Sequence, residues 1–297
     1  MSKTNNLILP VEDFGRQLIE TGDLDPVYNM LNASTLTPTG KAKFCLAYWC
    51  FYHVGFAAYV CDHEDPNAPG KTYWDTMRVA ALNLQPCPIT KDNRWPRGTE
   101  RRHFRGTAAI RTIDYLQDEF PNPADAVPWL AFGHDPGAAL PFLDIYRRAQ
   151  SWPGFGPWIA FKIADMMDAV LGYRISFEDT EDYFFQDPKL GAQFAMRQWE
   201  QSINATYVVY AVHRLLEQFR PLRIHTPSGP RSPATQEIET VLCKWKAHRN
   251  GHYPVGKDTR EILKGLAPWA HYSHTASHLH NILWKQAHAN GWAEATT

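Results

Sequence analysis

The run from Phe44 to Cys61 contains no Asp, Glu, Lys or Arg. A transmembrane helix needs roughly 17–25 predominantly apolar residues, so this run lies near the lower limit for a membrane span. Its tyrosines, tryptophan and histidine are spread along its whole length, whereas a membrane-spanning helix gathers its aromatic residues at the two interfaces. We therefore expect a buried central helix over residues 41–61 of a soluble protein.

The composition is that of an ordinary globular protein, with 297 residues, 44% hydrophobic and 21% charged. Lys and Arg total 30 against 31 Asp and Glu. This balance excludes a uniformly polycationic nucleic-acid binder but leaves room for a local basic patch. The five cysteines form no C-x-x-C pair, which argues against a disulfide framework and against a cysteine zinc site.

Apolar residues recur at helical spacing along most of the chain, and no alternating run is long enough to predict a strand. The sequence therefore predicts an all-α or nearly all-α fold. We expect one domain over residues 1–297, with a C-terminal helical extension from about residue 234 that follows a Pro-, Gly- and Ser-rich loop over 221–233. The expected helices cover residues 41–61, 73–84, 99–120, 136–150, 158–171, 233–248, 257–269 and 276–290, and much of 192–220.

A glycine-containing turn, Trp152-Pro153-Gly154-Phe155-Gly156-Pro157, separates two of these helices. Its glycines allow a tight turn and close approach of another chain. The amides that begin the second helix are suited to a phosphate. The turn resembles the helix-hairpin-helix of DNA glycosylases, here at about residues 140–171, although an ordinary αα-hairpin has the same pattern. The residues expected to contact DNA are Gly154, Phe155, Gly156, Trp158 and Lys162.

The segment from Arg94 to Gly106 is dense in arginine. Arginine is favoured where planar, bidentate contact with phosphate is needed. If the segment runs from a loop into a helix, Arg101 and Arg105 share a face at i, i+4. The alternative is a solvated helical surface with Glu100 as an internal partner. We expect phosphate binding here.

Two further segments carry polar aromatic and acidic side chains. Tyr48 and Tyr52 lie one helical turn apart on the apolar run, as do Trp49 and His53. Core packing is the simplest interpretation, but buried hydroxyl and imidazole groups need partners, and a slot for an extruded base would use them. Near the N-terminus, Gly22-Asp23-Leu24-Asp25-Pro26-Val27-Tyr28 offers either a helix cap with proline in first position or two acids that hold an ammonium group.

The C-terminal histidines between 271 and 280 place His274 and His278 at i, i+4. No H-E-x-x-H motif, acidic partner or cysteine partner accompanies them, so we expect no metal site. The sequence contains no P-loop, no Rossmann glycine fingerprint and no G-x-S-x-G motif. Nucleotide hydrolysis, NAD-dependent redox chemistry and serine hydrolase chemistry therefore have no support.

Taken together, four motifs resemble a family of phage enzymes, the amino acid:DNA transferases, also named α-glutamyl/putrescinyl thymine pyrophosphorylases. The resemblance spans roughly residues 20–220. The motifs are G-D-L-D-P-V-Y (22–28), A-Y-W-C-F-Y-H (47–53), R-W-P-R-G-x-E-R-R-H-F-R-G (94–106) and W-P-G-F-G-P-W-x-A-x-K-x-A-D (152–165).

The resemblance implies a glycosylase-like helical fold and a role in thymidine hypermodification. The substrates it implies are double-stranded phage DNA with a flipped 5-(pyrophosphomethyl)-deoxyuridine and a free amino acid such as glycine, whose amine displaces pyrophosphate. It further implies an upstream kinase that acts on 5-hydroxymethyl-deoxyuridine, action in the cytoplasm of the infected host, no membrane partner and no cofactor.

The resemblance also assigns roles, because the amine must lose a proton to attack and the leaving pyrophosphate gains charge. The candidates for the general base are His53, His103, Asp23 and Asp179. The residues expected to bind the base, the amino acid or the pyrophosphate are Asp25, Tyr28, Tyr48, Trp49, Tyr52, Arg94, Trp95, Arg97, Arg101, Arg102 and Arg105.

The chain departs from the glycosylase pattern at two positions. Ser176 stands where glycosylases keep an Asp, with Glu178 and Asp179 just after it, and Trp158 stands where lyase-type glycosylases carry a Lys. Schiff-base lyase chemistry therefore has no support. Two other functions remain open: a DNA base glycosylase, which would leave abasic DNA, and a non-catalytic DNA-binding protein.

Overall fold

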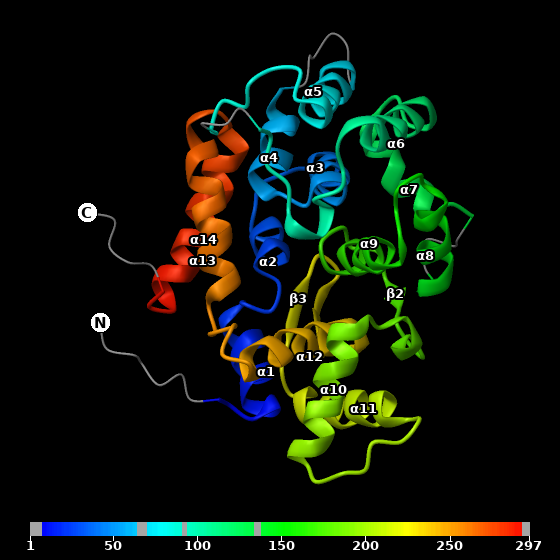
Figure 1. Cartoon of the computed structure of the whole chain (residues 1–297), viewed down its shortest axis with the longest axis vertical. Helices are drawn as coiled ribbons and strands as arrows, with labels where there is room; N and C mark the ends of the chain where they lie inside the picture. Colours follow the sequence, from blue (N-terminus) through cyan, green and yellow to red (C-terminus); the bar gives the residue numbers. More distant parts are fainter. Residues whose placement is uncertain (1–7, 64–69, 91–93, 134–137, 293–297) are drawn as a thin grey trace.

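The structure, a computed structural model, describes residues 8–63, 70–90, 94–133 and 138–292 (Figure 1). Most of these residues are helical, as predicted. The α-helices are α1 (Val11–Thr21), α2 (Pro26–Asn32), α3 (Pro38–Phe51), α4 (Val54–Asp62), α5 (Lys71–Leu82), α6 (Gly106–Glu119), α7 (Ala126–Leu130), α8 (Phe142–Ser151), α9 (Pro157–Ala169), α10 (Gln186–Gln198), α11 (Tyr207–Phe219), α12 (Thr235–Arg249), α13 (Lys257–Leu266) and α14 (His274–Ala289).

The remaining regular elements are short. Four 3-10 helices are η1 (Thr99–Arg101), η2 (Pro123–Asp125), η3 (Glu181–Tyr183) and η4 (Ala267–His271). Strand β1 (Leu140–Pro141) pairs in parallel with β2 (Ile175–Ser176), and β3 (Ile224–Thr226) pairs antiparallel with β4 (Gly229–Arg231). Figure 1 shows α10, α11 and α12 gathered at one end, α3 to α6 at the other, and α9 between them.

The prediction of one helix over residues 41–61 is wrong, because the run is divided between α3 and α4. Tyr52 ends α3 in the left-handed conformation, with φ of 51°. His53 begins α4 as its N-cap, and its Nδ1 accepts a hydrogen bond from the Phe56 amide at 3.2 Å. The Gly98 amide donates to the Phe51 carbonyl at 2.9 Å, so a distant loop satisfies the end of α3. The break directs Tyr52 and His53 to the surface of a cavity.

The prediction of a helix over residues 99–120 is also wrong at its start. Only η1 forms at residues 99–101, and α6 begins at Gly106. Arg101 and Arg105 therefore do not share a helical face. The cause is that Arg97 and Arg101 donate to backbone carbonyls, which holds this stretch in a 3-10 helix and turns: Arg97 binds the carbonyls of Trp95, Ala80 and Phe104, and Arg101 those of Cys50 and Gly154.

The glycine turn joins α8 to α9 as the sequence predicts. Gly154 has φ of 75°, a conformation that favours glycine. Its carbonyl accepts from Arg101 Nη1 at 2.9 Å, and the neighbouring Pro153 carbonyl accepts from Thr112 Oγ1 at 2.8 Å. Pro157 occupies the first position of α9, where a proline costs no backbone hydrogen bond. These hydrogen bonds from Arg101 and Thr112 hold the turn in place, while Gly154 and Gly156 are exposed.

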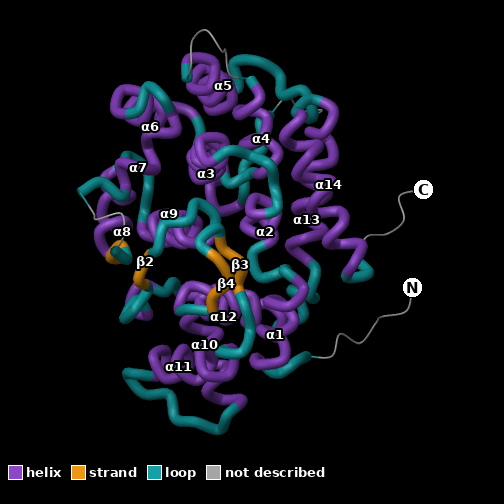
Figure 2. Tube along the Cα trace, turned by 180° about the vertical axis from the view of Figure 1, so that it is seen from behind, coloured by secondary structure: helices purple, strands orange, loops and turns teal. Residues whose placement is uncertain are grey.

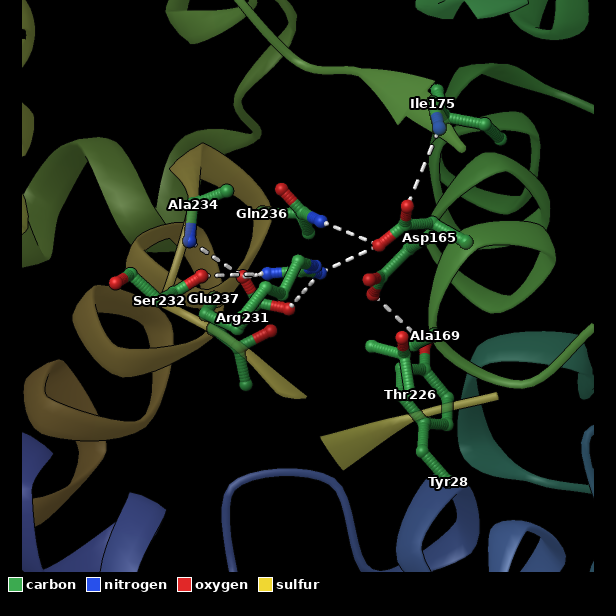
Figure 3. A network of polar contacts seen from close by, with 12 residues as sticks. Tyr28, Asp165, Ala169, Ile175, Thr226, Arg231, Ser232, Ala234, Gln236 and Glu237 are labelled. Carbon is green, nitrogen blue, oxygen red and sulfur yellow. Dashed lines mark hydrogen bonds and ion pairs between the residues drawn. The ribbon is translucent and has the colours of Figure 1, made fainter. Parts of the chain in front are cut away.

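The loop expected over residues 221–233 contains the β3–β4 hairpin (Figure 2). Arg231 on β4 forms ion pairs with Asp168 of α9 at 2.5 Å and with Glu237 of α12 at 2.8 Å. Figure 3 shows Arg231 beside Glu237. Gln236 Nε2 also donates to Asp168 at 3.2 Å. Buried side chains on both sides of the hairpin belong to one hydrophobic core. The hairpin therefore fastens α12 to α9.

Within the described ranges, no helix is both long and apolar enough to cross a membrane.

Candidate functional site

A cavity of about 770 Å³ opens between α2, α3, α9, α10, α12 and α13, and we call it the large cavity. It brings together residues that are far apart in the sequence. One part of its wall is aromatic and includes Tyr48, Tyr52 and Trp158, and another part carries charged groups. The charged residues that line it are Asp25, Glu100, Lys162, Asp187, Glu239, Lys244, Asp258 and Glu261.

The aromatic wall is built where α3 breaks. The Tyr48 and Tyr52 rings stack with centroids 4.5 Å apart, and Trp158 of α9 meets Tyr52 edge-on at 4.9 Å. Tyr48 is buried, whereas Tyr52 and Trp158 are half-buried. Such rings present a flat apolar surface against which a planar ligand can stack. Trp158 lies two residues beyond Gly156, so the glycine turn and the aromatic wall are adjacent.

Lys162 is the centre of a buried charged cluster. Its Nζ lies 3.2 Å from Asp165 Oδ2, 3.4 Å from Glu239 Oε2 and 3.2 Å from Thr240 Oγ1. Tyr28 Oη donates to the same Asp165 oxygen at 2.8 Å. Burial by itself lowers the pKa of Lys162, but the carboxylates of Glu239 and Asp165 raise it well above its ordinary value. Lys162 therefore carries a fixed positive charge.

Asp25 is a cavity carboxylate that titrates near neutrality. It is the N-cap residue of α2, with Pro26 in first position as predicted, but its side chain makes no capping hydrogen bond within α2. It lines the cavity instead. Desolvation raises the pKa of Asp25 to about 7, although Lys162 and Lys244 oppose the shift. A carboxylate with such a pKa can accept and release a proton at physiological pH.

His53 also lines the large cavity, but in a different state. Burial lowers its pKa to about 4, and its Nδ1 accepts the hydrogen bond from the Phe56 amide. The imidazole is therefore neutral at physiological pH, with Nδ1 committed to the start of α4. Of the four predicted candidates for the general base, it is the one that reaches the cavity.

The other three candidates lie elsewhere. Asp23 is completely buried and holds the segment that begins α13, because its carboxylate accepts hydrogen bonds from the amides of Gly256 and Thr259 and from the hydroxyls of Thr259 and Tyr253. His103 and Asp179 are exposed and do not line the large cavity. We do not propose these three as bases.

Two predicted base-binding tryptophans lie in the core. Trp49 is completely buried, and its Nε1 lies 3.1 Å from Met166 Sδ. Trp95 is 5% exposed and donates to the Gln85 carbonyl at 2.9 Å. By contrast, Asp25, Tyr28, Tyr48 and Tyr52 all line the large cavity, as the base- and amine-binding predictions require.

The predicted arginines divide into two groups. Arg97 is half-buried and Arg101 is 8% exposed, and both are bound to backbone carbonyls. Arg94, Arg102 and Arg105 are exposed. The part of this segment that lines the large cavity is Gly98, Thr99 and Glu100, so the arginines lie beside the cavity rather than inside it.

The predicted DNA-contacting residues also divide. Gly154 and Gly156 are exposed on the turn, and Trp158 reaches from the turn to the cavity. Phe155 is 4% exposed, with the Arg101 guanidinium 4.9 Å from its ring. Lys162, which we expected to touch the DNA backbone, belongs to the buried cluster.

Sequence reasoning missed most of the polar cavity wall, together with Asp165 beneath it. The missed wall residues are Asp187, Glu239, Thr240, Lys244, Asp258 and Glu261. The available signal was weak. Glu239 and Thr240 lie within the apolar sequence Ile238 to Leu242 of a predicted helix, where a carboxylate is costly to bury without a partner. The partner, Lys162, is 77 residues away, and only the packing of α9 against α12 shows the pairing.

Acidic groups outnumber lysines on the wall of the large cavity. Both lysines are themselves paired with carboxylates: Lys162 with Asp165 and Glu239, and Lys244 with Asp258, whose Oδ2 lies 2.6 Å from the Lys244 Nζ. The cavity thus favours a positively charged ligand over an anion. In the described part of the chain, no group of three or more His, Cys, Asp or Glu side chains is placed to hold a metal ion.

Comparison with known proteins identifies related chains. Residues 4–252 match the amino acid:DNA transferase family. The chain is 37% identical over 286 residues to the glycinyltransferase of Pseudomonas phage PaMx11, an alignment that covers 90% of this chain and 94% of that protein. It is 26% identical over 254 residues to the putrescinyltransferase of Delftia phage PhiW-14, covering 83% of this chain and 74% of that protein.

Proposed function

The chain belongs to the amino acid:DNA transferase family, and from that premise we propose that it transfers glycine onto thymidine-derived bases of phage DNA. The glycine amine attacks the C5-methylene of 5-(pyrophosphomethyl)-deoxyuridine and displaces pyrophosphate. The observation that carries the proposal is the large cavity, which combines an aromatic wall with an excess of carboxylates.

The aromatic wall suits an extruded base. An enzyme that acts on a base within a duplex must flip it out of the stack and hold it between apolar or aromatic side chains. Tyr52 and Trp158 offer such surfaces, and the Tyr48 ring stacks on the Tyr52 ring with centroids 4.5 Å apart. A volume of about 770 Å³ lies within the range that ligand pockets occupy, roughly 300–1,000 Å³.

The excess of carboxylates suits the incoming amine. Glycine arrives with its amine protonated, and Asp25 takes that proton because its pKa is about 7. The neutral amine then forms a C–N bond to the methylene carbon. The C–O bond to pyrophosphate breaks, and its electron pair leaves with the pyrophosphate. The product amine remains attached to the base, and the second proton it carries passes to solvent.

The exposed arginines suit the leaving group. Pyrophosphate is repelled by the acidic wall, so it departs toward the arginine-rich segment beside the cavity. Arg102 and Arg105 are exposed there, close in sequence to Glu100 on the cavity wall. Guanidinium groups stabilise the charge that builds on the phosphate oxygens.

The glycine turn suits the DNA backbone. Exposed Gly154 and Gly156 let a strand approach the main chain, and Trp158 continues from the turn to the cavity. We propose that α8, the turn and α9 act as a helix-hairpin-helix at about residues 140–171. We also propose one functional domain over residues 1–297, because Tyr253 and α13 complete the cavity wall.

The setting of the reaction follows from its substrate. We propose that a kinase acting on 5-hydroxymethyl-deoxyuridine in DNA supplies the pyrophosphorylated base. We propose that both enzymes act in the cytoplasm of the infected bacterial host.

The test uses duplex DNA that contains 5-(pyrophosphomethyl)-deoxyuridine, incubated with the protein and a mixture of amino acids. The DNA is digested to nucleosides and their masses are measured. A nucleoside that carries one glycine, with an equal amount of pyrophosphate released, supports the proposal. Free base or abasic sites would instead identify a base glycosylase, and DNA that binds without change would identify a binding protein.

A further inference from the structure

A second, smaller cavity of about 240 Å³ shares part of its wall with the large cavity, and we call it the small cavity. It lies between α1, α2, β3 and α14. Asp25 and Tyr28 line both cavities. The carboxylate that we assign as the base is therefore reached from two directions.

The small cavity carries charges of both signs. Arg223, His225 and Glu20 are exposed on its wall, and Asp25 and Glu237 also line it. Glu237 is neutralised by its two hydrogen bonds with Arg231, at 2.8 and 2.9 Å. Asp25 is therefore the acid of the pair that remains available to a cation.

Arg223 is placed to hold an anion. Its Nη1 donates to the carbonyls of Arg220 and Leu222 at 3.0 and 2.8 Å, which fixes the guanidinium. Among the described residues, its Nε and Nη2 have no hydrogen-bond partner. A planar guanidinium with unused donors suits a carboxylate. His225, on β3, lines the same cavity.

These features fit a small zwitterion. A free α-amino acid has one carboxylate and one ammonium, which match Arg223 and Asp25. A volume of about 240 Å³ is below the range typical of drug-sized ligands and is sufficient for a free amino acid such as glycine.

We propose that the amino acid enters through the small cavity, with its carboxylate on Arg223 and its ammonium on Asp25, while the DNA base occupies the large cavity. The inference rests on the proposed function, since it assigns one of its two substrates. Because the two substrates approach Asp25 from different sides, the amino acid reaches its site even when DNA covers the large cavity.

The first test separates the two substrates kinetically. In R223A, the KM for glycine rises about tenfold or more, as expected when a charged hydrogen bond is lost, and the KM for DNA stays within about twofold. The matched control is R220A, an exposed arginine nearby that does not line the small cavity. Glycinamide, which has no carboxylate, is used equally well by R223A and the wild type. An unchanged KM for glycine in R223A, or an equal rise in both KM values, overturns the proposal.

The second test changes the volume of the small cavity at the half-buried Ile224. I224W fills the small cavity and abolishes transfer while DNA affinity is retained, and a thermal melt checks that the variant folds. If it does not fold, I224A replaces it. This variant enlarges the small cavity and accepts alanine, so the preference for glycine over alanine falls. Retained transfer in folded I224W, or an unchanged preference in I224A, contradicts the assignment.

A binding measurement keeps this inference separate from the proposed function. Glycine is titrated by calorimetry into the wild type and R223A in the presence of unmodified duplex DNA, where no transfer is possible. Binding to the wild type that R223A weakens supports the small cavity even if the base substrate has been misassigned. No binding to the wild type, or equal binding to both proteins, overturns it.

Discussion

The arginine-rich segment and the large cavity use charge in opposite ways. In the segment, Arg97 and Arg101 donate to backbone carbonyls. These two clustered arginines therefore stabilise the fold. In the cavity, Lys162, Asp165 and Glu239 come from two helices that are distant in sequence, and they form a buried cluster around one cation.

The difference shows that charge density in a sequence does not locate a site. An arginine has several donors and readily satisfies carbonyl groups that a broken helix leaves open. A buried carboxylate needs a cation or hydrogen-bond donor beside it. Which residue supplies that partner depends on how the helices pack. The groups within the two regions are therefore expected to respond differently to mutation. Asp25 and the exposed arginines should affect mainly catalysis, whereas the buried Lys162 cluster and the arginines bound to carbonyls should affect mainly stability.

The largest effect is expected at Asp25. D25N removes the base, so kcat falls about 10²–10⁴-fold, the usual contribution of general base catalysis. The wild-type rate rises with pH through about 7, because only the ionised carboxylate accepts a proton. That rise is lost in D25N. Steady-state rates between pH 5 and 9 measure both effects, and a D25N enzyme with the wild-type profile would exclude Asp25 as the base.

Stability provides the control for D25N. Burial raises the pKa of Asp25 from 3.8 to about 7, so the folded state holds this proton more tightly than the unfolded chain. The stability associated with the proton is complete below pH 3.8 and is lost as pH rises through 7. Asn cannot ionise, so urea unfolding should show D25N gaining stability relative to the wild type as pH rises from about 4 to 7, with no further gain above that.

The next effect is expected at Lys162 and tests whether the cavity cluster also supports the fold. K162M leaves Asp165 and Glu239 buried without their cation, which costs about 3–5 kcal/mol in the free energy of unfolding. The double variant K162M/E239Q removes one of the unpaired charges and should recover part of the loss. Urea unfolding measures both, and a loss below about 1 kcal/mol would show that the cluster is solvated.

Helical periodicity predicted the all-α fold and most helices, but not their breaks. Nothing in the residues around Tyr52 marks a helix end, because the break depends on the Gly98 amide, which reaches the Phe51 carbonyl from a distant loop. The predicted start of α6 was wrong for a similar reason. Local periodicity reports which face of a helix is apolar, and it carries no information on hydrogen bonds from remote segments.

Residues that line the large cavity were predictable where they belong to one segment. Asp25, Tyr28, Tyr48 and Tyr52 were selected because an acid beside an aromatic ring, or hydroxyl groups on an apolar helix, are locally unusual. Glu239 and Asp165 needed the contact between α9 and α12. Lys162 was recognised but expected on the DNA backbone, because the sequence does not show that it is buried beside two carboxylates.

A smaller effect is expected at Arg101, where the segment joins the glycine turn. R101A removes hydrogen bonds to the carbonyls of Cys50 and Gly154, and the cost is about 2–3 kcal/mol in the free energy of unfolding. R101K keeps the charge but cannot bridge both carbonyls, so it should recover little. Unchanged stability together with lost DNA affinity would mean that Arg101 binds DNA and does not stabilise the fold.

The smallest effect is expected at Arg102 and Arg105, the exposed arginines of the same segment. R102A and R105A should leave the free energy of unfolding within about 0.5 kcal/mol. Each should lower kcat/KM about two- to fivefold, because exposed ion pairs contribute about 0.2–1 kcal/mol. That loss should disappear at high salt, which screens exposed charges, whereas the D25N defect should persist. A salt-independent loss in R102A or R105A would place the guanidinium inside a desolvated pyrophosphate site, and the contrast between segment and cavity would fail.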